Sequence, residues 1–198
     1  MKGLIIAVLL GIVLTLPVKA VMAAKNPTDD LRITLDAVIS LLADQKMDKL
    51  AKRKQVVAKI RQDFDFEAMS RFILAPNWQA ATDAQRKKFV DLYTRILEDT
   101  YIERIEAYTN EKVKFLNEKT REDKAMVDTI IVGTSTQIPV DYKLWLDKDK
   151  WRVYDVSIEG VSLVRNFQET YKQVIRKDGI DGLLVKMEEK LKEMGAAK

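Results

Sequence analysis

The amino-acid sequence predicts an α+β protein in which helices come first, a four-stranded antiparallel sheet follows, and further helices close the chain. Before residue 110 and again after residue 162, apolar residues recur every three to five positions, as they do in amphipathic helices. Between residues 112 and 158 apolar and polar residues alternate instead, which is the pattern of half-buried strands. The links between these strands are short, so consecutive strands are expected to pair antiparallel.

The first 23 residues have the features of a cleavable signal peptide. Lys2 is followed by an almost unbroken apolar stretch over residues 4–16, and small residues surround an expected cleavage site near Ala23. The apolar stretch is shorter than the roughly 20 residues that a spanning helix needs, and Lys19 interrupts it. The sequence therefore predicts an exported, soluble mature chain over residues 24–198.

Four helical segments are expected before residue 110. The apolar positions that define the first two are Leu31, Leu35, Val38, Ile39 and Leu42, then Val56, Val57, Ile60 and Phe64. Thr28 or Asp29 can cap the first helix, and Pro76 ends a third apolar stripe that begins at Phe66. Thr82 to Gln85 resembles a capping box, and the long helix that it opens has an unusually aromatic stripe.

The predicted strands cover residues 112–117, 125–132, 137–146 and 150–158. The last strand leads through Gly160 into a helix without a polar loop, because Gly160 gives the backbone freedom to turn. No repeat or linker divides the chain, so one domain is expected, with a possible helical subdomain 28–110 packed on the sheet 111–160. No exposed heptad or long apolar edge is evident, which favours a monomer.

Composition excludes many functions. The chain has no His and no Cys, which rules out Ser-His-Asp and Cys-His catalysis, disulfides and the usual zinc sites. Its glycines are scattered, so it has neither a P-loop nor a GxGxxG turn, and we expect no cofactor and no metal. Removing Lys2 and Lys19 with the signal leaves 32 basic and 30 acidic residues, a net charge of +2, so nucleic acid is not an expected partner.

Two carboxylates interrupt apolar strands and allow an alternative interpretation. Asp141 or Asp155, held in an apolar cleft, could act as a general base of an isomerase or dehydratase, with Tyr142 or Tyr154 as hydrogen-bond donor. The other interpretation is structural: one face of the sheet is solvated, or these acids pair with Arg152 or Arg165. We favour the structural interpretation and predict that the protein is not an enzyme. An envelope interaction module without a ligand is a further alternative.

Several segments in order resemble the MlaC, or toluene-tolerance, family of periplasmic phospholipid-binding proteins. They are FDFEAMSR (64–71), Trp78, TDAQRKKFVDLYTRILEDTY (82–101), VDY (140–142), WRVYDVSIEGVSLVRNF (151–167) and DGIDGLLVKMEEK (178–190). Ala75 and Pro76 stand where the family pattern has a glycine-containing turn. The resemblance covers residues 64–191, most of the mature chain.

The resemblance implies a periplasmic carrier that shuttles phospholipid between membranes and so maintains outer-membrane lipid asymmetry. Its implied partners are an inner-membrane ABC transporter complex with its substrate-binding component, and an outer-membrane lipoprotein/porin complex. The acyl chains of the phospholipid, which is cargo rather than cofactor, would occupy an apolar cavity between a curved sheet and the helices. The cavity residues implied are Phe72, Phe89, Tyr93, Ile96, Val113, Phe115, Ile138, Val140, Tyr142, Leu144, Val153, Val156, Leu163 and Phe167.

Overall fold

The computed structural model describes residues 26–107 and 111–196, so the expected signal peptide, residues 1–23, lies outside the described residues. The helices are α1 Pro27–Ala43, α2 Lys49–Asp63, α3 Phe66–Leu74, α4 Pro76–Ala80, α5 Asp83–Glu106 and α6 Leu163–Ala196. The strands are β1 Lys112–Arg121, β2 Lys124–Val132, β3 Gln137–Asp147, β4 Lys150–Ile158 and β5 Val161–Ser162. Within the described part of the chain, no helix has the length and apolar character needed to cross a bilayer.

The sheet confirms the predicted α+β class and adds one strand to it. Its order is β1-β2-β3-β4-β5, and every neighbouring pair is antiparallel. The prediction of four strands was wrong because β5 has only two residues, too few to produce an alternating pattern. It forms where the chain turns back through Glu159 and Gly160, both at positive φ, and it pairs with the end of β4.

The first strand is longer than predicted because its alternation is broken midway. The register between β1 and β2 shifts between Phe115 and Asn117, which is a β-bulge at Leu116. A bulge inserts an extra residue, so the inward-facing residues of β1 have odd numbers before the bulge and even numbers after it. A strand prediction that follows strict alternation therefore stops at the bulge, whereas β1 continues to Arg121.

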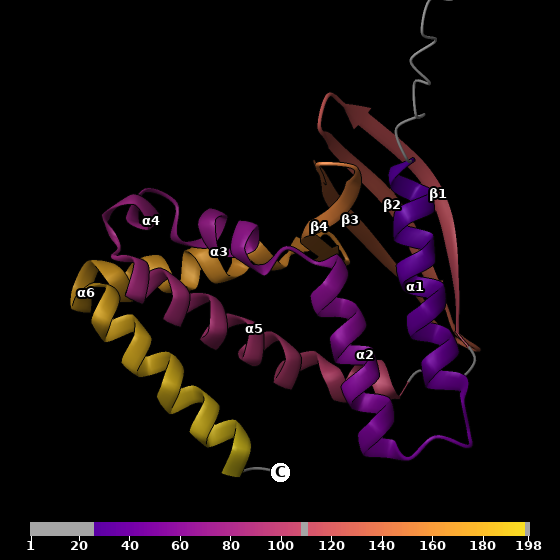
Figure 1. Cartoon of the computed structure of the whole chain (residues 1–198), viewed down its shortest axis with the longest axis horizontal. Coiled ribbons are helices and arrows are strands. Elements are labelled where there is room, and N and C mark those ends of the chain that lie inside the picture. Colours follow the sequence, from indigo (N-terminus) through magenta and orange to yellow (C-terminus); the bar gives the residue numbers. More distant parts are fainter. Residues whose placement is uncertain (1–25, 108–110, 197–198) are drawn as a thin grey trace, which may run out of the picture.

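The helices occupy two regions around the sheet (Figure 1). Helix α1 runs along the curved sheet and packs against β1, β2 and β4, with α2 beside it. Helices α3, α5 and α6 pack on one another and extend away from the sheet. Helix α6 bends at Gly179 (φ 71, ψ −175), and its second half returns alongside α5.

The apolar residues form two separate clusters. The main core joins the sheet to α3, α5 and α6, and it includes Leu31 at the start of α1. The second cluster is small and consists of Val38, Leu42, Val56 and Ile102, from α1, α2 and the end of α5. Helix α1 therefore contributes to both clusters and crosses the boundary between them.

Local signals fix the helix ends. Thr82 and Gln85 form the predicted capping box at the start of α5. At α1 the predicted caps are replaced by Asn26, whose side chain accepts from the backbone N–H of Thr28 while Pro27 takes the first helical position. Ala75, between α3 and α4, has φ 50 and ψ −126, a conformation that favours glycine. This is the position at which the family pattern has a glycine-containing turn.

Candidate functional site

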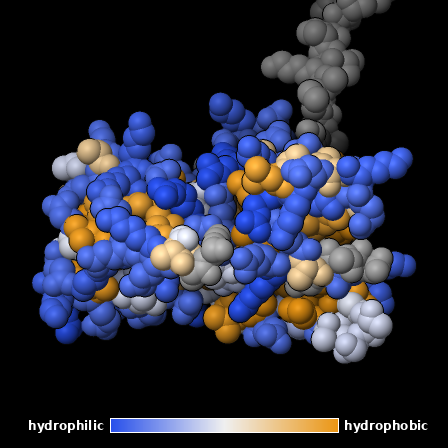
Figure 2. Space-filling model, turned by 90° about the horizontal axis from the view of Figure 1, so that it is seen from below, coloured by the Kyte–Doolittle hydropathy of each residue, from blue (hydrophilic) through white to orange (hydrophobic). Residues whose placement is uncertain are grey.

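An apolar chamber lies between the inner face of the sheet and the α1–α2 pair. Its volume is about 150 Å³. The lining residues come from α1, α2, the end of α5 and the first three strands, with Phe64 just after α2 and Glu111 just before β1. They are Thr34, Leu35, Val38, Ile39, Leu42, Ile60, Phe64, Ile105, Glu111, Val113, Ile131 and Tyr142. Seen from below, apolar residues reach the surface on both halves of the molecule, including the half that holds the sheet, α1 and α2 (Figure 2).

Two regular patterns bring these residues together. Along α1, the lining residues recur at helical spacing, so they share the face that is turned toward the sheet. On the sheet, Val113 of β1 lies directly opposite Ile131 of β2, on the inward side of the pleat. The chamber also lies where the main core and the second cluster meet, because its lining includes residues of both.

Thr34 is the polar residue of α1 in the chamber wall, and its hydroxyl is hydrogen-bonded to a carboxylate outside the lining. The Thr34 hydroxyl donates to the Asp63 carboxylate at 2.7 Å, and Lys59 and Lys150 also contact that carboxylate. Burial alone would raise the pKa of Asp63, but the hydrogen bonds from Lys150, Lys59 and Thr34 outweigh it, so the pKa lies below its ordinary value. Asp63 is therefore a buried anion that ties α1, α2 and β4 together beside the chamber.

Polar contacts fasten each of the two helices to a neighbouring element. Trp151 of β4 donates its backbone N–H to the Asp30 carboxylate of α1 at 3.0 Å. Arg53 of α2 makes two hydrogen bonds of 2.6 Å to Glu106 of α5. Polar contacts thus hold α1 on β4 and α2 on α5 around a space whose lining is mostly apolar.

The structure distributes the sequence-predicted site residues over three places. Val113 and Tyr142 line the chamber. Phe89, Tyr93 and Phe167 pack on one another and on Tyr171, with ring centroids 5.2–6.1 Å apart. Buried in the same main core are Ile96, Val140, Leu144, Val153, Val156 and Leu163, while Phe115 and Ile138 pack against it partly buried. Phe72 is 47% exposed, and its ring stacks on Tyr154.

The sequence analysis missed most of the helical wall. Leu35, Val38, Ile39 and Leu42 of α1 line the chamber, as do Ile60 near the end of α2 and Phe64 just after it. Their apolar spacing was visible, but such spacing does not say whether a helix face meets other side chains or a space. The family resemblance begins at Phe64, so it assigned no role to α1.

The two strand carboxylates have structural surroundings. Asp155 is buried and accepts hydrogen bonds from Lys143 Nζ (2.9 Å), the Ser162 hydroxyl (2.7 Å) and the Val164 backbone N–H (3.2 Å). It therefore holds the first turn of α6 on the sheet. The expected pairing of these acids with Arg152 or Arg165 was wrong for Asp155, because Lys143 lies directly opposite it in the register of β3 and β4.

Asp141 faces away from the chamber. It lies opposite Asp128 of β2, and partial burial together with that carboxylate raises the pKa of Asp141. The two tyrosines considered as hydrogen-bond donors for catalysis lie in different places: Tyr142 lines the chamber, and Tyr154 stacks on Phe72. Among the described residues, no group of three or more acidic side chains could hold a metal ion.

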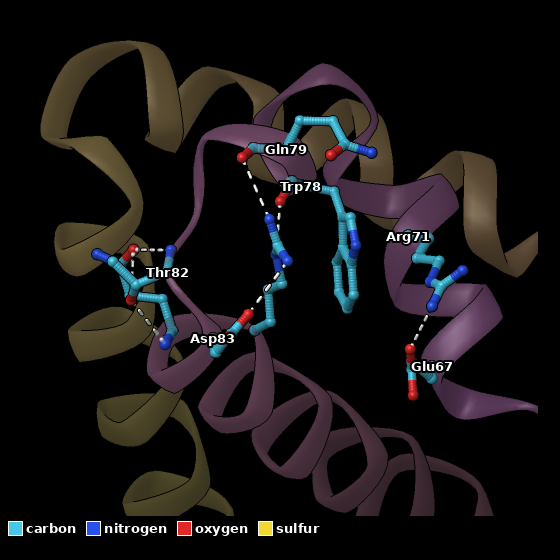
Figure 3. A network of polar contacts seen from close by, with 8 residues as sticks. Glu67, Arg71, Trp78, Gln79, Thr82 and Asp83 are labelled. Atoms are coloured by element: carbon cyan, nitrogen blue, oxygen red, sulfur yellow. Dashed lines mark hydrogen bonds and ion pairs between the residues drawn. The ribbon is translucent and has the colours of Figure 1, made fainter.

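Residues of the family-like segments also form an arginine–tryptophan cluster that joins α3, α4 and α5 (Figure 3). Arg71 and Arg86 both lie near the Trp78 ring, with each guanidinium carbon 5.6 Å from its centroid. Arg86 also donates to the backbone oxygens of Trp78 (2.8 Å) and Gln79 (3.2 Å). These contacts hold α4 against the start of α5, which gives these motif residues a structural role.

Comparison with known proteins identifies relatives over most of the chain. The family model described as MlaC protein matches residues 32–189. The intermembrane phospholipid transport system binding protein MlaC of Haemophilus influenzae is 25% identical over 171 residues, which cover 75% of this chain and 80% of that protein. A solved structure of the phospholipid-binding protein from Ralstonia solanacearum in complex with a phospholipid matches with a TM-score of 0.80 at 21% identity, covering 86% of this chain and 99% of that one.

The fold and the chamber define a class of α+β proteins with an apolar space between a curved sheet and overlying helices. The solved structure from Ralstonia solanacearum has the same fold. Because the family match spans most of its length, the chain belongs to the MlaC family.

Proposed function

We propose that this protein is a periplasmic carrier that binds phospholipid with its acyl chains in the chamber between α1–α2 and the sheet. The observation that carries the proposal is the apolar lining of this chamber in a MlaC-family fold. The names of two relatives support it, since one is a phospholipid transport system binding protein and the other was solved with a phospholipid. The signal-like residues 1–23 support export to the periplasm.

The energetics of this role require only an apolar interior. Burying about 30 acyl methylenes at roughly 0.8 kcal/mol each gives more than about 20 kcal/mol relative to water, near the limit of noncovalent binding. A lipid that leaves a bilayer starts in an apolar medium, however, so transfer into the chamber is nearly neutral. The chain therefore needs no nucleotide site, and direction would come from its partners.

Cargo of this size requires the chamber to enlarge. Its volume of about 150 Å³ is below the roughly 300–1,000 Å³ of small-molecule sites. The chamber lies between the main core and the second cluster, so enlargement there does not require either cluster to be split. We therefore infer that the α1–α2 pair stays fastened to β4 and moves away from β1–β3 when acyl chains enter.

The proposed transport route has two ends. The carrier would receive or deliver phospholipid at an inner-membrane ABC transporter complex with its substrate-binding component, and at an outer-membrane lipoprotein/porin complex. It would act as a monomer with residues 24–198 as one lipid-binding domain. In this role it would help maintain outer-membrane lipid asymmetry.

Lipid extraction from the mature protein, purified without detergent, tests the proposal. Mass spectrometry of the extract should detect close to stoichiometric phospholipid. Val38→Trp, which fills the chamber from α1, should lower the lipid content at least twofold. Leu50→Trp is the matched control, because Leu50 is on α2 but 60% exposed, and it should retain the lipid. A lipid-free wild-type protein, or a Val38→Trp protein with full cargo, would contradict the proposal.

A further inference from the structure

The outer face of the sheet carries a cationic surface that neither the core nor the chamber uses. In the register of the sheet, Lys119, Met126 and Lys143 form one cross-strand row, and Arg121, Lys124 and Trp145 form the next. Inward-facing neighbours in the same strands, such as Val127 and Leu144, are buried in the main core. These two rows therefore point away from the chamber.

A groove that is shallow over the cationic rows runs across this surface and deepens toward α3. One part of it, about 220 Å³, is lined by four cations and by no carboxylate: Lys119, Arg121, Lys124 and Lys143, with Thr120, Ala125, Met126 and Tyr154. It is continuous with a larger depression of about 530 Å³, since both are lined by Lys124 and Tyr154. Phe72 of α3 borders the larger depression, and its ring centroid lies 5.2 Å from that of Tyr154.

The cations of this groove are left with few internal partners. Lys143 pairs with Asp155, but among residues 26–107 and 111–196 no ion pair is formed by Lys119, Arg121 or Lys124. Arg121 and Lys124 lie directly opposite each other, and like charges in that position destabilise a strand pair. The two-residue turn between them carries Glu122 and Asp123, but within the described residues neither carboxylate forms an ion pair with these cations. The three cations therefore remain available to an external anion.

The aromatic pair adds a second kind of contact. Phe72 is 47% exposed, so a large apolar surface borders the cations without being covered. In the larger depression, the charges other than Lys124 are internally paired: Arg71 with Glu67, and Arg152 with Asp65 and Asp147. An incoming segment would therefore meet free positive charge at one end of the groove and an aromatic surface beside it.

We propose that this groove is a docking site for an acidic segment of a partner protein. We name it the hairpin groove and define it by Phe72, Lys119, Arg121, Lys124, Lys143 and Tyr154. Carboxylates of the segment meet Lys119, Arg121 and Lys124, and an apolar side chain rests on the Phe72–Tyr154 pair. This inference rests on the proposed carrier role, because a carrier has to be held by its partners while cargo moves.

The geometry favours a protein segment over a lipid surface as the occupant. The cationic part of the hairpin groove is shallow, and Phe72 lies in the adjoining deeper part between α3 and the sheet, so a protruding segment can reach both parts where a flat bilayer meets only the shallow one. A bilayer at this face would also be separated from the chamber by the sheet itself, because the chamber is on the inner side. A protein tether has no such constraint, since it can hold one face while the chamber remains accessible.

The test uses the full mature chain and a short fluorescein-labelled peptide of alternating Glu and Leu. The wild-type protein should bind this peptide, with amide NMR shifts confined to the hairpin groove. The triple variant Lys119→Glu/Arg121→Glu/Lys124→Glu should bind it at least about tenfold more weakly. The matched triple variant Lys172→Glu/Arg176→Glu/Lys190→Glu reverses three exposed charges of α6 and should bind as the wild type does.

Three outcomes would overturn the inference: no binding of the acidic peptide, equal weakening by both triple variants, or binding at the groove of phosphatidylglycerol vesicles in place of the peptide. The phospholipid content of each variant is measured on the same samples. Wild-type lipid content with lost peptide binding supports the docking site. Absence of lipid from the wild-type protein would instead count against the carrier role.

Discussion

Replacing Asp63 by Asn should destabilise the wall of the chamber selectively. The side chain of Asp63 is 3% exposed, and it contacts Thr34 of α1, Lys59 of α2 and Lys150 of β4. Asparagine has nearly the same shape but no charge, so the two ammonium groups lose their counterion. Its amide group can also satisfy fewer of the three donors, because one of its two polar atoms is itself a donor.

The expected loss follows from the burial of the groups involved. Removing one partner of a fully buried ion pair costs about 3–5 kcal/mol. Lys59 and Lys150 are 21% and 36% exposed, so water can partly solvate them after the substitution. We therefore expect a loss of about 2–4 kcal/mol in the free energy of unfolding, and a decrease of roughly 10 °C in Tm for a domain of this size.

Urea denaturation at a series of pH values measures this effect. The folded-state pKa of Asp63 lies below its ordinary value of 3.8, so its contribution is present above that pH and is lost as the pH falls through the folded pKa. The difference between wild type and Asp63→Asn should be constant near neutrality and shrink in acid. Asp91→Asn is the control, because Asp91 is 63% exposed, and it should cost almost nothing. A loss below about 1 kcal/mol for Asp63→Asn would refute the reasoning.

Three further substitutions test local features by thermal denaturation. Asp155→Asn should cost about 1–3 kcal/mol, because Lys143, Ser162 and Val164 lose a charged acceptor; unchanged stability would contradict its role at the start of α6. Ala75→Gly should stabilise by about 1 kcal/mol through relief of strain at φ 50, and a lower Tm would argue against that strain. Gly160→Ala should cost about 1 kcal/mol from φ 81 alone, since an added Cβ has no atom within 4 Å; a neutral change would be the contrary result.

The sheet could be predicted from the sequence wherever alternation is regular. In β3, Val140, Tyr142 and Leu144 alternate with polar neighbours and are buried, as expected from a strand with one covered face. In β1 the bulge at Leu116 changes which residues face inward, and the sequence pattern gave no sign of the bulge. The start of α5 was predictable for a local reason, because a capping box needs only the four residues from Thr82 to Gln85.

The chamber depends on contacts that local patterns do not encode. The aromatic stripe of α5 and the apolar stripe of α1 are both amphipathic in sequence. The first meets Phe167 and Tyr171 of α6, whose rings pack on Phe89 and Tyr93. The second faces the sheet where β1–β3 leave a space that α1 does not fill. Whether a stripe is packed along its whole length is decided by the tertiary arrangement of α6 and α1, more than 100 residues apart in the chain.

Photo-crosslinking with a phospholipid that carries a diazirine on its acyl chain tests the central claim most directly. After lipid exchange and irradiation of the mature protein, peptide mapping should find the lipid on α1, the end of α2 and β1–β3, at chamber residues such as Val38, Ile39 and Val113. Crosslinks concentrated instead at Phe89, Tyr93 and Phe167 would place the acyl chains between α5 and α6 and contradict the account.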